Sequence, residues 1–210
     1  MQAAKTQQRL AGILFLAAFL AYGFGAGLVA GILEAMNPAG ALVAKRTEFF
    51  TGASLMLLNS VIVAGIGLLL RPVLAHYSKA VSRLYLLTRL AEAALLAAGV
   101  IAVIYFMTVQ EPTPPFAMMK ARRANFFAYQ IGMAVLGFGS LFFCALLHRA
   151  RLIPRFAAIW GFCGYAIFLA GALLELGGVN SGVLLSIPGG LFELFFGVWL
   201  IVKGFRQTHH

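Results

Sequence analysis

Six long apolar runs, separated by short polar segments, limit what this chain can fold into more than any other feature of its sequence. A helix that crosses the hydrocarbon layer of a membrane needs roughly 20 mostly apolar residues, and each run reaches that length. The composition agrees, because 62% of the residues are hydrophobic, 10% are charged and the mean hydropathy is +0.94. Soluble domains carry about 25% charged residues, so the sequence predicts a membrane protein.

The six runs predict six transmembrane helices in a single bundle that takes up residues 1–210. Helices are expected because a backbone in hydrocarbon must satisfy its own hydrogen bonds. The first run is longer than the apolar core of a signal peptide, about 7–15 residues, and is therefore expected to remain as a span. The predicted fold class is all-α, a polytopic membrane helix bundle. The predicted spans are residues 10–33, 47–70, 80–107, 125–147, 156–177 and 182–203.

Prolines mark two of the predicted boundaries. Pro72 directly follows the second run, and a proline in that place is a common stop signal for a helix. The segment EPTPPF, residues 111–116, holds three prolines, which remove backbone donors and fix φ, so it cannot lie inside a helix. We therefore expect the second helix to end near residue 70 and the fourth span to begin near residue 125.

The distribution of Lys and Arg predicts which side of the membrane each link faces, because cytoplasmic links carry more of these residues than external ones. With both termini in the cytoplasm, ten basic residues lie on the cytoplasmic side: Lys5, Arg9, Arg71, Lys79, Arg83, Arg149, Arg151, Arg155, Lys203 and Arg206. Five lie on the other side: Lys45, Arg46, Lys120, Arg122 and Arg123. We therefore expect both termini in the cytoplasm, with the KARR segment, 120–123, at the membrane interface.

The third run places two ionisable residues near the middle of the membrane. Arg89 and Glu92 lie roughly 14 Å and 18 Å along the helix from Ala80, at about 1.5 Å per residue, and a spacing of three puts them on one face. A single charge at this depth costs at least about 2.5–3.5 kcal/mol, so a buried partner is expected. Glu193 in the sixth run lies at a similar depth, and Arg89 could bridge both glutamates. With Arg89 charged, the cluster is neutral when only one glutamate is ionised.

Two interpretations of this cluster stay open. It is either a structural link between the third and sixth helices or a site for a proton, an ion or a ligand. Pro188, Gly189 and Gly190 precede Glu193 and predict a kink beside it, as in the broken helices of transporter sites. Further candidates for a ligand or ion site are Asn59 in the second run, Gln130 in the fourth and Glu175 at the end of the fifth.

Glycines recur every four residues in the first run, at Gly23, Gly27 and Gly31. Such a face lets another helix approach closely, and we expect it to pack inside the bundle, with a dimer interface as the alternative.

The sequence contains no pattern typical of a metal or cofactor site. Cys144 and Cys163 lie in different apolar runs without CxxC spacing, and His76 and His148 lie in separate links. No catalytic serine motif or phosphate-binding glycine loop is present, and the lack of Asp excludes a Ser-His-Asp triad. We therefore expect no metal and no cofactor. The net charge of +10 is spread in short clusters between the runs rather than in one patch, so no nucleic-acid partner is expected.

Four stretches carry a resemblance to a known family: RLAGILFLAAFLAY (9–22), LTRLAEAALLAAGV (87–100), RARLIPRFAAIWGFCGY (149–165) and IPGGLFELFFGVWLIVKGF (187–205). In combination they resemble a bacterial membrane family of unknown function, domain of unknown function 4386. The resemblance implies a six-helix protein of the bacterial inner membrane. It also implies that Arg89, Glu92, Pro188 and Glu193 belong to the family pattern, and it supplies no substrate or reaction.

Three hypotheses about function follow. The first is an integral membrane protein of the bacterial inner membrane that handles a small lipophilic or ionic ligand, as a transporter or a sensor does, around Arg89, Glu92 and Glu193. The second is a non-catalytic scaffold or accessory subunit. The third is an intramembrane enzyme acting on a lipid-like substrate, which needs a cavity that reaches a carboxylate. The lipid bilayer is the one partner that the sequence predicts directly, and no oligomeric state is predicted.

Overall fold

The computed structural model describes residues 2–35, 37–108, 115–180 and 182–206, and every regular element within these ranges is helical. Six helices are long and apolar enough to cross a membrane, which confirms the predicted fold class. They are α1 (Gln2–Leu33), α3 (Arg46–Ala75), α4 (Lys79–Thr108), α5 (Pro115–Arg149), α6 (Arg155–Leu176) and α7 (Ile187–Val202). A short helix, α2 (Pro38–Ala44), joins α1 to α3, and a 3₁₀ helix (Gly182–Ser186) precedes α7.

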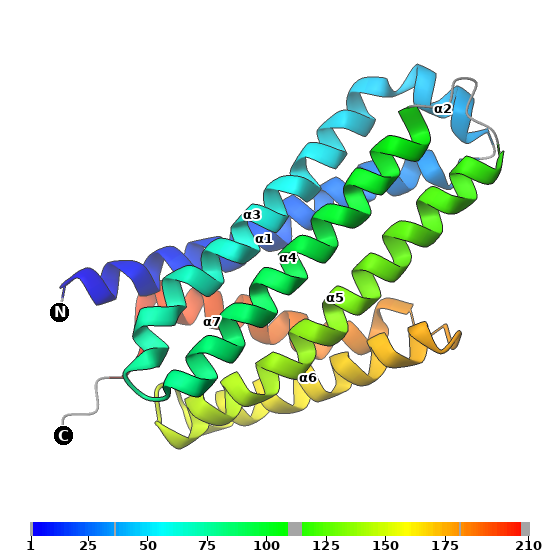
Figure 1. Cartoon of the computed structure of the whole chain (residues 1–210). Coiled ribbons are helices and arrows are strands. Elements are labelled where there is room, and N and C mark those ends of the chain that lie inside the picture. Colours follow the sequence, from blue (N-terminus) through cyan, green and yellow to red (C-terminus); the bar gives the residue numbers. More distant parts are fainter. Residues whose placement is uncertain (1, 36, 109–114, 181, 207–210) are drawn as a thin grey trace.

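The six long helices form a closed ring in the order of the sequence. Each packs mainly on its neighbours, from α1 on α3 through to α6 on α7, and α7 closes the ring against α1. Figure 1 shows both termini at the same end of the ring, as an even number of crossings requires. We call this the terminal end, and the opposite end, which carries α2, the distal end. The cytoplasmic location of the terminal end stays a prediction.

The bundle places apolar side chains on its outside and several polar ones inside. Phe24, Val61 and Leu87 are 66%, 69% and 63% exposed, although none of them has a polar atom in its side chain. Arg89 and Asn59, in contrast, are buried. This distribution suits a solvent of lipid chains, which covers apolar surface at no cost and penalises charge.

The predicted end of the second helix is wrong. Helix α3 continues through Pro72 to Ala75. Pro72 is exposed in the last turn, while Val73 and Leu74 are buried in the core. The free energy gained by burying these two side chains therefore outweighs the cost of the backbone hydrogen bond that proline cannot make.

Helix α5 begins at Pro115, before the start of the predicted fourth span near residue 125. Ala117 and Ala121 are fully buried one helical turn apart, whereas Lys120 and Arg122 are exposed. The KARR segment therefore belongs to the first turns of α5 and presents its charges outward. Residues 111–114 of the proline-rich segment lie outside the described residues.

The irregularity predicted in the sixth span lies slightly earlier than expected. The chain changes from the 3₁₀ helix to α7 between Ser186 and Ile187, and Pro188 occupies the first turn of α7. A proline is well tolerated there, because the first N–H groups of a helix have no partner within it. Pro188 thus starts a helix rather than kinking one.

The glycines at positions 23, 27 and 31 do not pack inside the bundle, contrary to expectation. An added Cβ at any of the three would meet no atom within 4 Å. Other glycines make the close contacts of α1 instead. A Cβ on Gly25 would lie 2.8 Å from the carbonyl oxygen of Gly52 in α3, and one on Gly12 would lie 2.5 Å from the carbonyl oxygen of Gly197 in α7. These pairs allow α1 to close the ring on both sides.

Candidate functional site

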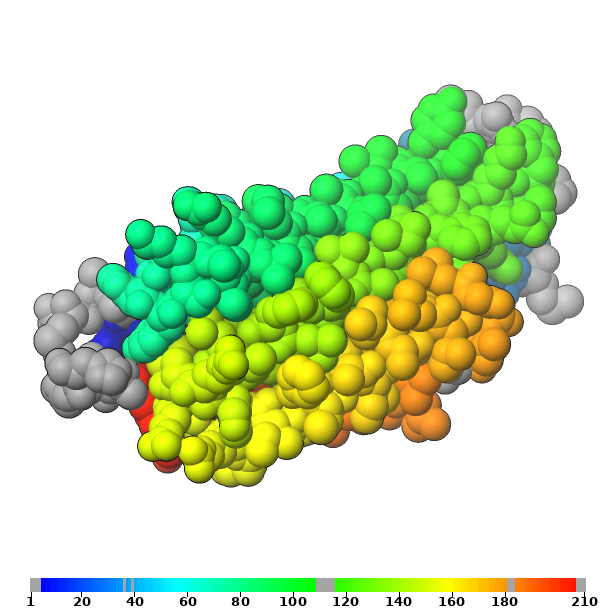
Figure 2. Space-filling model, turned by 60° about the horizontal axis from the view of Figure 1, so that its bottom comes forward, coloured from blue at the N-terminus to red at the C-terminus, as the bar shows by residue number. Residues whose placement is uncertain are grey.

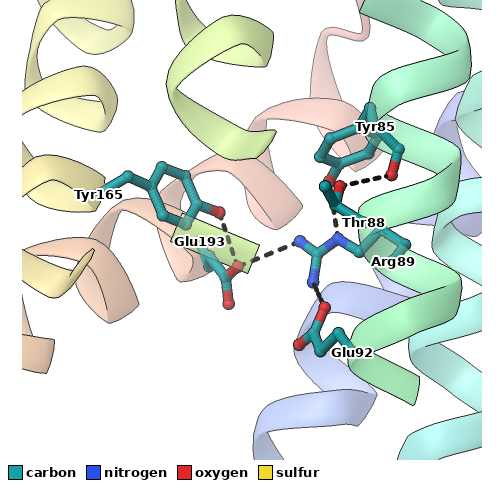
Figure 3. A network of polar contacts seen from close by, with 6 residues as sticks. All are labelled: Tyr85, Thr88, Arg89, Glu92, Tyr165 and Glu193. Atoms are coloured by element: carbon teal, nitrogen blue, oxygen red, sulfur yellow. Dashed lines mark hydrogen bonds and ion pairs between the residues drawn. The ribbon is translucent and has the colours of Figure 1, made fainter. Parts of the chain in front are cut away.

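Arg89 is the centre of a polar network inside the ring (Figure 3). Its Nε donates to the hydroxyl of Tyr85 at 3.0 Å, and its Nη1 donates to Oε2 of Glu92 at 3.0 Å. Its Nη2 donates to Oε1 of Glu193 at 3.2 Å, which joins α4 to α7. The side chains of Arg89 and Glu92 are 2% and 4% exposed, so this is a buried ion pair with a second carboxyl group attached.

Glu193 is held by two donors that reach the same oxygen. The hydroxyl of Tyr165 on α6 donates to Oε1 at 2.6 Å, and Arg89 reaches that oxygen from the other side. Its side chain is 18% exposed, against 4% for Glu92. Glu193 is therefore the more accessible of the two carboxyl groups.

Aromatic rings cover the guanidinium of Arg89. Its Cζ lies 5.2 Å from the centre of the Phe15 ring and 5.3 Å from that of Tyr85. Tyr85 in turn stacks on Phe143, with ring centres 4.4 Å apart. Cation–π contacts of this kind contribute about 0.5–2 kcal/mol each when water is absent. Each nitrogen of the guanidinium therefore makes one hydrogen bond, and two aromatic rings lie against the group.

Two glycines bring the neighbouring helices close enough for this network. A Cβ on Gly67 of α3 would lie 2.9 Å from the Cβ of Arg89, so a glycine is needed where α3 passes the arginine. A Cβ on Gly164 of α6 would lie 3.1 Å from the Cα of Gly189 in the first turn of α7. This close approach of α6 and α7 lets Tyr165, the next residue, reach the carboxyl group on α7.

A cavity of about 520 Å³ lies inside the ring, next to the network. Leu96, one turn beyond Glu92, lines it, whereas Tyr85 does not, so the cavity extends from the network toward the distal end. All six long helices contribute to its wall, for example through Tyr22, Asn59, Leu96, Tyr129, Phe168 and Leu194. The wall is mostly apolar, and the charged groups lie together on one side of it.

Several polar groups of the wall have no partner within the described part of the chain. The contacts to Glu92 and Glu193 use one oxygen of each carboxyl group, so Oε1 of Glu92 and Oε2 of Glu193 accept nothing. Figure 3 shows both oxygens on the side of the guanidinium away from Tyr85, which is the side of the cavity. Asn59 is only 4% exposed, lines the cavity and has no hydrogen-bond partner among these residues. These groups line the cavity, so a molecule inside it can supply their missing hydrogen bonds.

The charges of the cluster do not balance when every group is ionised. One guanidinium faces two carboxyl groups, which leaves one negative charge in a region where an isolated charge costs several kcal/mol. The cluster is neutral when one carboxyl group holds a proton or when a cation binds beside them. It can therefore take up a proton or a positively charged group.

The structure brings together some of the predicted site residues and leaves others apart. The expected meeting of charges from the third and sixth spans is confirmed by the contact between Arg89 and Glu193. Asn59 lies in the cavity wall, as do Gly189 and Gly190. Gln130 and Glu175 do not line the cavity. Their predicted role in binding stays untested by this geometry.

The sequence reasoning missed the tyrosines of the site. Tyr85 lies four residues before Arg89, a spacing that puts both on one helical face, so it could have been found. Tyr165, Tyr22 and Tyr129 come from three other helices, and their convergence depends on how the ring closes. The rings of Tyr22 and Tyr129 stack across the cavity wall with centres 5.4 Å apart. No group of three metal-ligating side chains occurs in the described ranges.

This fold and site define a multi-pass membrane protein, a six-helix ring around an internal cavity with a buried arginine–glutamate cluster. The chain belongs to the family described as Domain of unknown function (DUF4386), whose model matches residues 10–204, and the resemblance noted in the sequence is thereby confirmed. No curated protein and no solved structure matches the chain.

Proposed function

We propose that this protein binds a small molecule in the cavity of the ring and acts as a transporter-like or sensor-like protein of the bacterial inner membrane, with both termini in the cytoplasm. One observation carries the proposal. A cavity of about 520 Å³ ends on carboxyl oxygens of Glu92 and Glu193 to which no described residue donates a hydrogen bond. Ligand cavities in proteins are commonly about 300–1,000 Å³, mostly apolar, with a few convergent polar groups.

The same observation favours ligand binding over the scaffold hypothesis. A purely structural link between helices is most stable when every buried donor and acceptor has a partner. Here Asn59 and one oxygen of each carboxyl group have no hydrogen-bond partner among the described residues. Unsatisfied acceptors that face a cavity are what a bound molecule would use. An intramembrane enzyme would need the same cavity, and it would release a changed molecule, whereas a binding protein returns its ligand unchanged.

Binding can be tested on the purified protein by native mass spectrometry with three probes of equal chain length: decylamine, decan-1-ol and decanoate. At least one is expected to bind one-to-one and to be recovered unchanged. Val63 lines the cavity and is buried, so Val63→Trp should occupy part of the cavity and weaken binding. Val61 on the same helix is 69% exposed on the outside, so Val61→Trp is the matched control and should bind normally. Binding that is equal in both variants, or absent for all three probes, would refute the proposal.

Reconstituted vesicles distinguish the two forms of the proposal. A transporter-like protein should move protons across the vesicle membrane when a probe that binds is supplied on one side. The reason is that either a proton or a cation neutralises the cluster, so the two can exchange there. Glu193→Gln should abolish this signal, since an amide neither releases a proton nor carries a negative charge. Probe binding without proton movement supports a sensor-like protein.

A further inference from the structure

We propose that the ligand is an amine dissolved in the membrane, an ammonium group on an apolar body, which enters the cavity sideways from the hydrocarbon layer between α1 and α7. This inference rests on the proposed function and adds the charge of the ligand and its route.

The sign of the ligand's charge follows from which hydrogen-bonding groups of the cluster have no partner among the described residues. All three nitrogens of the Arg89 guanidinium already donate, to Tyr85, Glu92 and Glu193, and the rings of Phe15 and Tyr85 cover it. The arginine side chain is only 2% exposed and is already paired with two carboxyl groups, so an anion would meet a net negative charge when both glutamates are ionised. Oε1 of Glu92 and Oε2 of Glu193 have no donor among the described residues, and carboxyl oxygens accept hydrogen bonds and attract positive charge.

An ammonium group can donate hydrogen bonds to these carboxyl oxygens and can also neutralise the excess negative charge of the cluster. It carries three N–H donors and one positive charge, and the cluster offers two open carboxyl oxygens and one excess negative charge when both glutamates are ionised. Hydrogen bonds between charged groups are about twice as strong as neutral ones. The stacked rings of Tyr22 and Tyr129 and the ring of Tyr165 also line the cavity, and aromatic rings attract cations.

The route follows from the residues that both line the cavity and are exposed on the outside of the ring. They are Phe19 and Gly23 on α1 and Ile187 and Leu191 on α7. Figure 1 shows these two helices side by side at the terminal end and separating toward the distal end. On another side of the molecule, Figure 2 shows α4, α5 and α6 as adjoining bands of atoms with no deep hollow between them. The cavity thus opens between the first and the last helix of the ring.

The opening has a closed end and a movable cover. Toward the terminal end, Gly12 and Gly197 bring the two backbones into contact, since a Cβ on Gly12 would lie 2.5 Å from the carbonyl oxygen of Gly197. Further along, the ring of Phe19 lies over Gly190, where an added Cβ would be 3.0 Å from Cζ of Phe19. A phenylalanine side chain can rotate about its own bonds, whereas a backbone contact cannot open in this way. Phe19 therefore covers the opening and can uncover it.

The depth of the opening in the membrane limits which molecules can enter the cavity. Phe19 lies midway along the first span, roughly 21 Å from Lys5 and roughly 21 Å from Leu33 at about 1.5 Å per residue. That position faces the acyl chains rather than water. A molecule that enters there must first dissolve in the hydrocarbon layer, which an alkylamine does as the neutral base. At the cluster it takes the proton that one carboxyl group holds, which leaves an ammonium group beside two carboxylates.

The test uses the protein in lipid nanodiscs with radiolabelled decylamine and decanoate, read by scintillation proximity, with empty nanodiscs subtracted. Decylamine should bind more tightly than decanoate. Glu193→Gln should weaken the binding of decylamine by about ten- to a hundredfold, the loss expected for one charged hydrogen bond.

The route is tested by association rates. Gly23→Leu places a side chain in the opening between α1 and α7 and should slow the association of decylamine about tenfold or more. Gly27→Leu, one turn away, is the matched control, because an added Cβ meets no atom at either glycine and Gly27 does not line the cavity. Phe19→Ala should speed association.

Each part of the inference can fail separately. Decanoate binding more tightly than decylamine would overturn the charge of the ligand. Equal association rates in Gly23→Leu, Gly27→Leu and Phe19→Ala would overturn the route. In both cases the cavity would still bind a ligand whose binding Val63→Trp weakens, so the proposed function would stand. Absence of binding by every probe would instead remove the proposed function itself.

Discussion

Replacing Arg89 by methionine tests how strongly the cluster is held together. Methionine has a similar length and no charge, so Arg89→Met removes the hydrogen bonds to Tyr85, Glu92 and Glu193 and leaves two carboxyl groups without a cation. Breaking one partner of a buried ion pair typically costs about 3–5 kcal/mol. The total free energy of unfolding of a domain is only about 5–15 kcal/mol, so the loss should be large.

The same reasoning predicts a partial recovery when the carboxyl groups are also removed. In Arg89→Met combined with Glu92→Gln and Glu193→Gln no buried charge remains, and the triple variant should be about 1–3 kcal/mol more stable than Arg89→Met alone. The free energy of unfolding can be measured by denaturant titration in lipid–detergent bicelles. Arg83→Met is the matched control, because Arg83 is exposed near the start of the same helix, and it should change stability by about 0.5 kcal/mol or less. A cost of Arg89→Met below about 1 kcal/mol, or a triple variant no more stable than the single one, would refute this reasoning.

Three further predictions follow from particular contacts. Gly67→Ala should destabilise the protein by about 1–3 kcal/mol in the same unfolding assay, because the added Cβ would lie 2.9 Å from the Cβ of Arg89. The control, Gly65→Ala, should cost less, because its Cβ would meet only the end of a leucine side chain at 3.2 Å. Tyr165→Phe removes the hydroxyl that donates to the α7 carboxyl group at 2.6 Å, and it should weaken decylamine binding while the Val61→Trp control binds normally. In intact cells a membrane-impermeant maleimide should label Lys45→Cys and not Arg206→Cys, in a background without the native cysteines; the reverse pattern would contradict cytoplasmic termini.

The meeting of Arg89 and Glu193 could be predicted from the sequence, although the two residues are far apart in it. The cost of a charge in hydrocarbon requires a partner, and only a few ionisable residues lie at that depth in the other spans. The number of spans followed from length and hydropathy in the same way. Both predictions rest on a strong energy term that does not depend on the details of packing.

The cavity and its opening could not be predicted, because they depend on which side chains leave space where six helices meet. Tyr22 and Tyr129 come from different helices, and the sequence does not state that their rings stack. Gly23 and Gly27 look alike in the sequence, yet only Gly23 lies beside the cavity. The predicted end of the second helix was wrong for a related reason. At Pro72 the local stop signal was outweighed by the burial of the next two side chains, which only the tertiary structure reveals.

The most direct test of the central claim, that a lipid-accessible cavity reaches a carboxyl group, is chemical modification of Glu193 by dicyclohexylcarbodiimide. A protonated carboxyl group adds across one C=N bond of this lipophilic reagent to give an O-acylisourea. Its acyl group then moves from oxygen to nitrogen, which leaves a stable N-acylurea that peptide mass spectrometry locates. We predict that Glu193 is modified in membranes, that decylamine protects it, and that Gly23→Leu slows the reaction while Gly27→Leu does not. Glu193 unmodified under conditions that modify the exposed Glu48, or modified equally in both glycine variants and without protection by decylamine, would contradict the account.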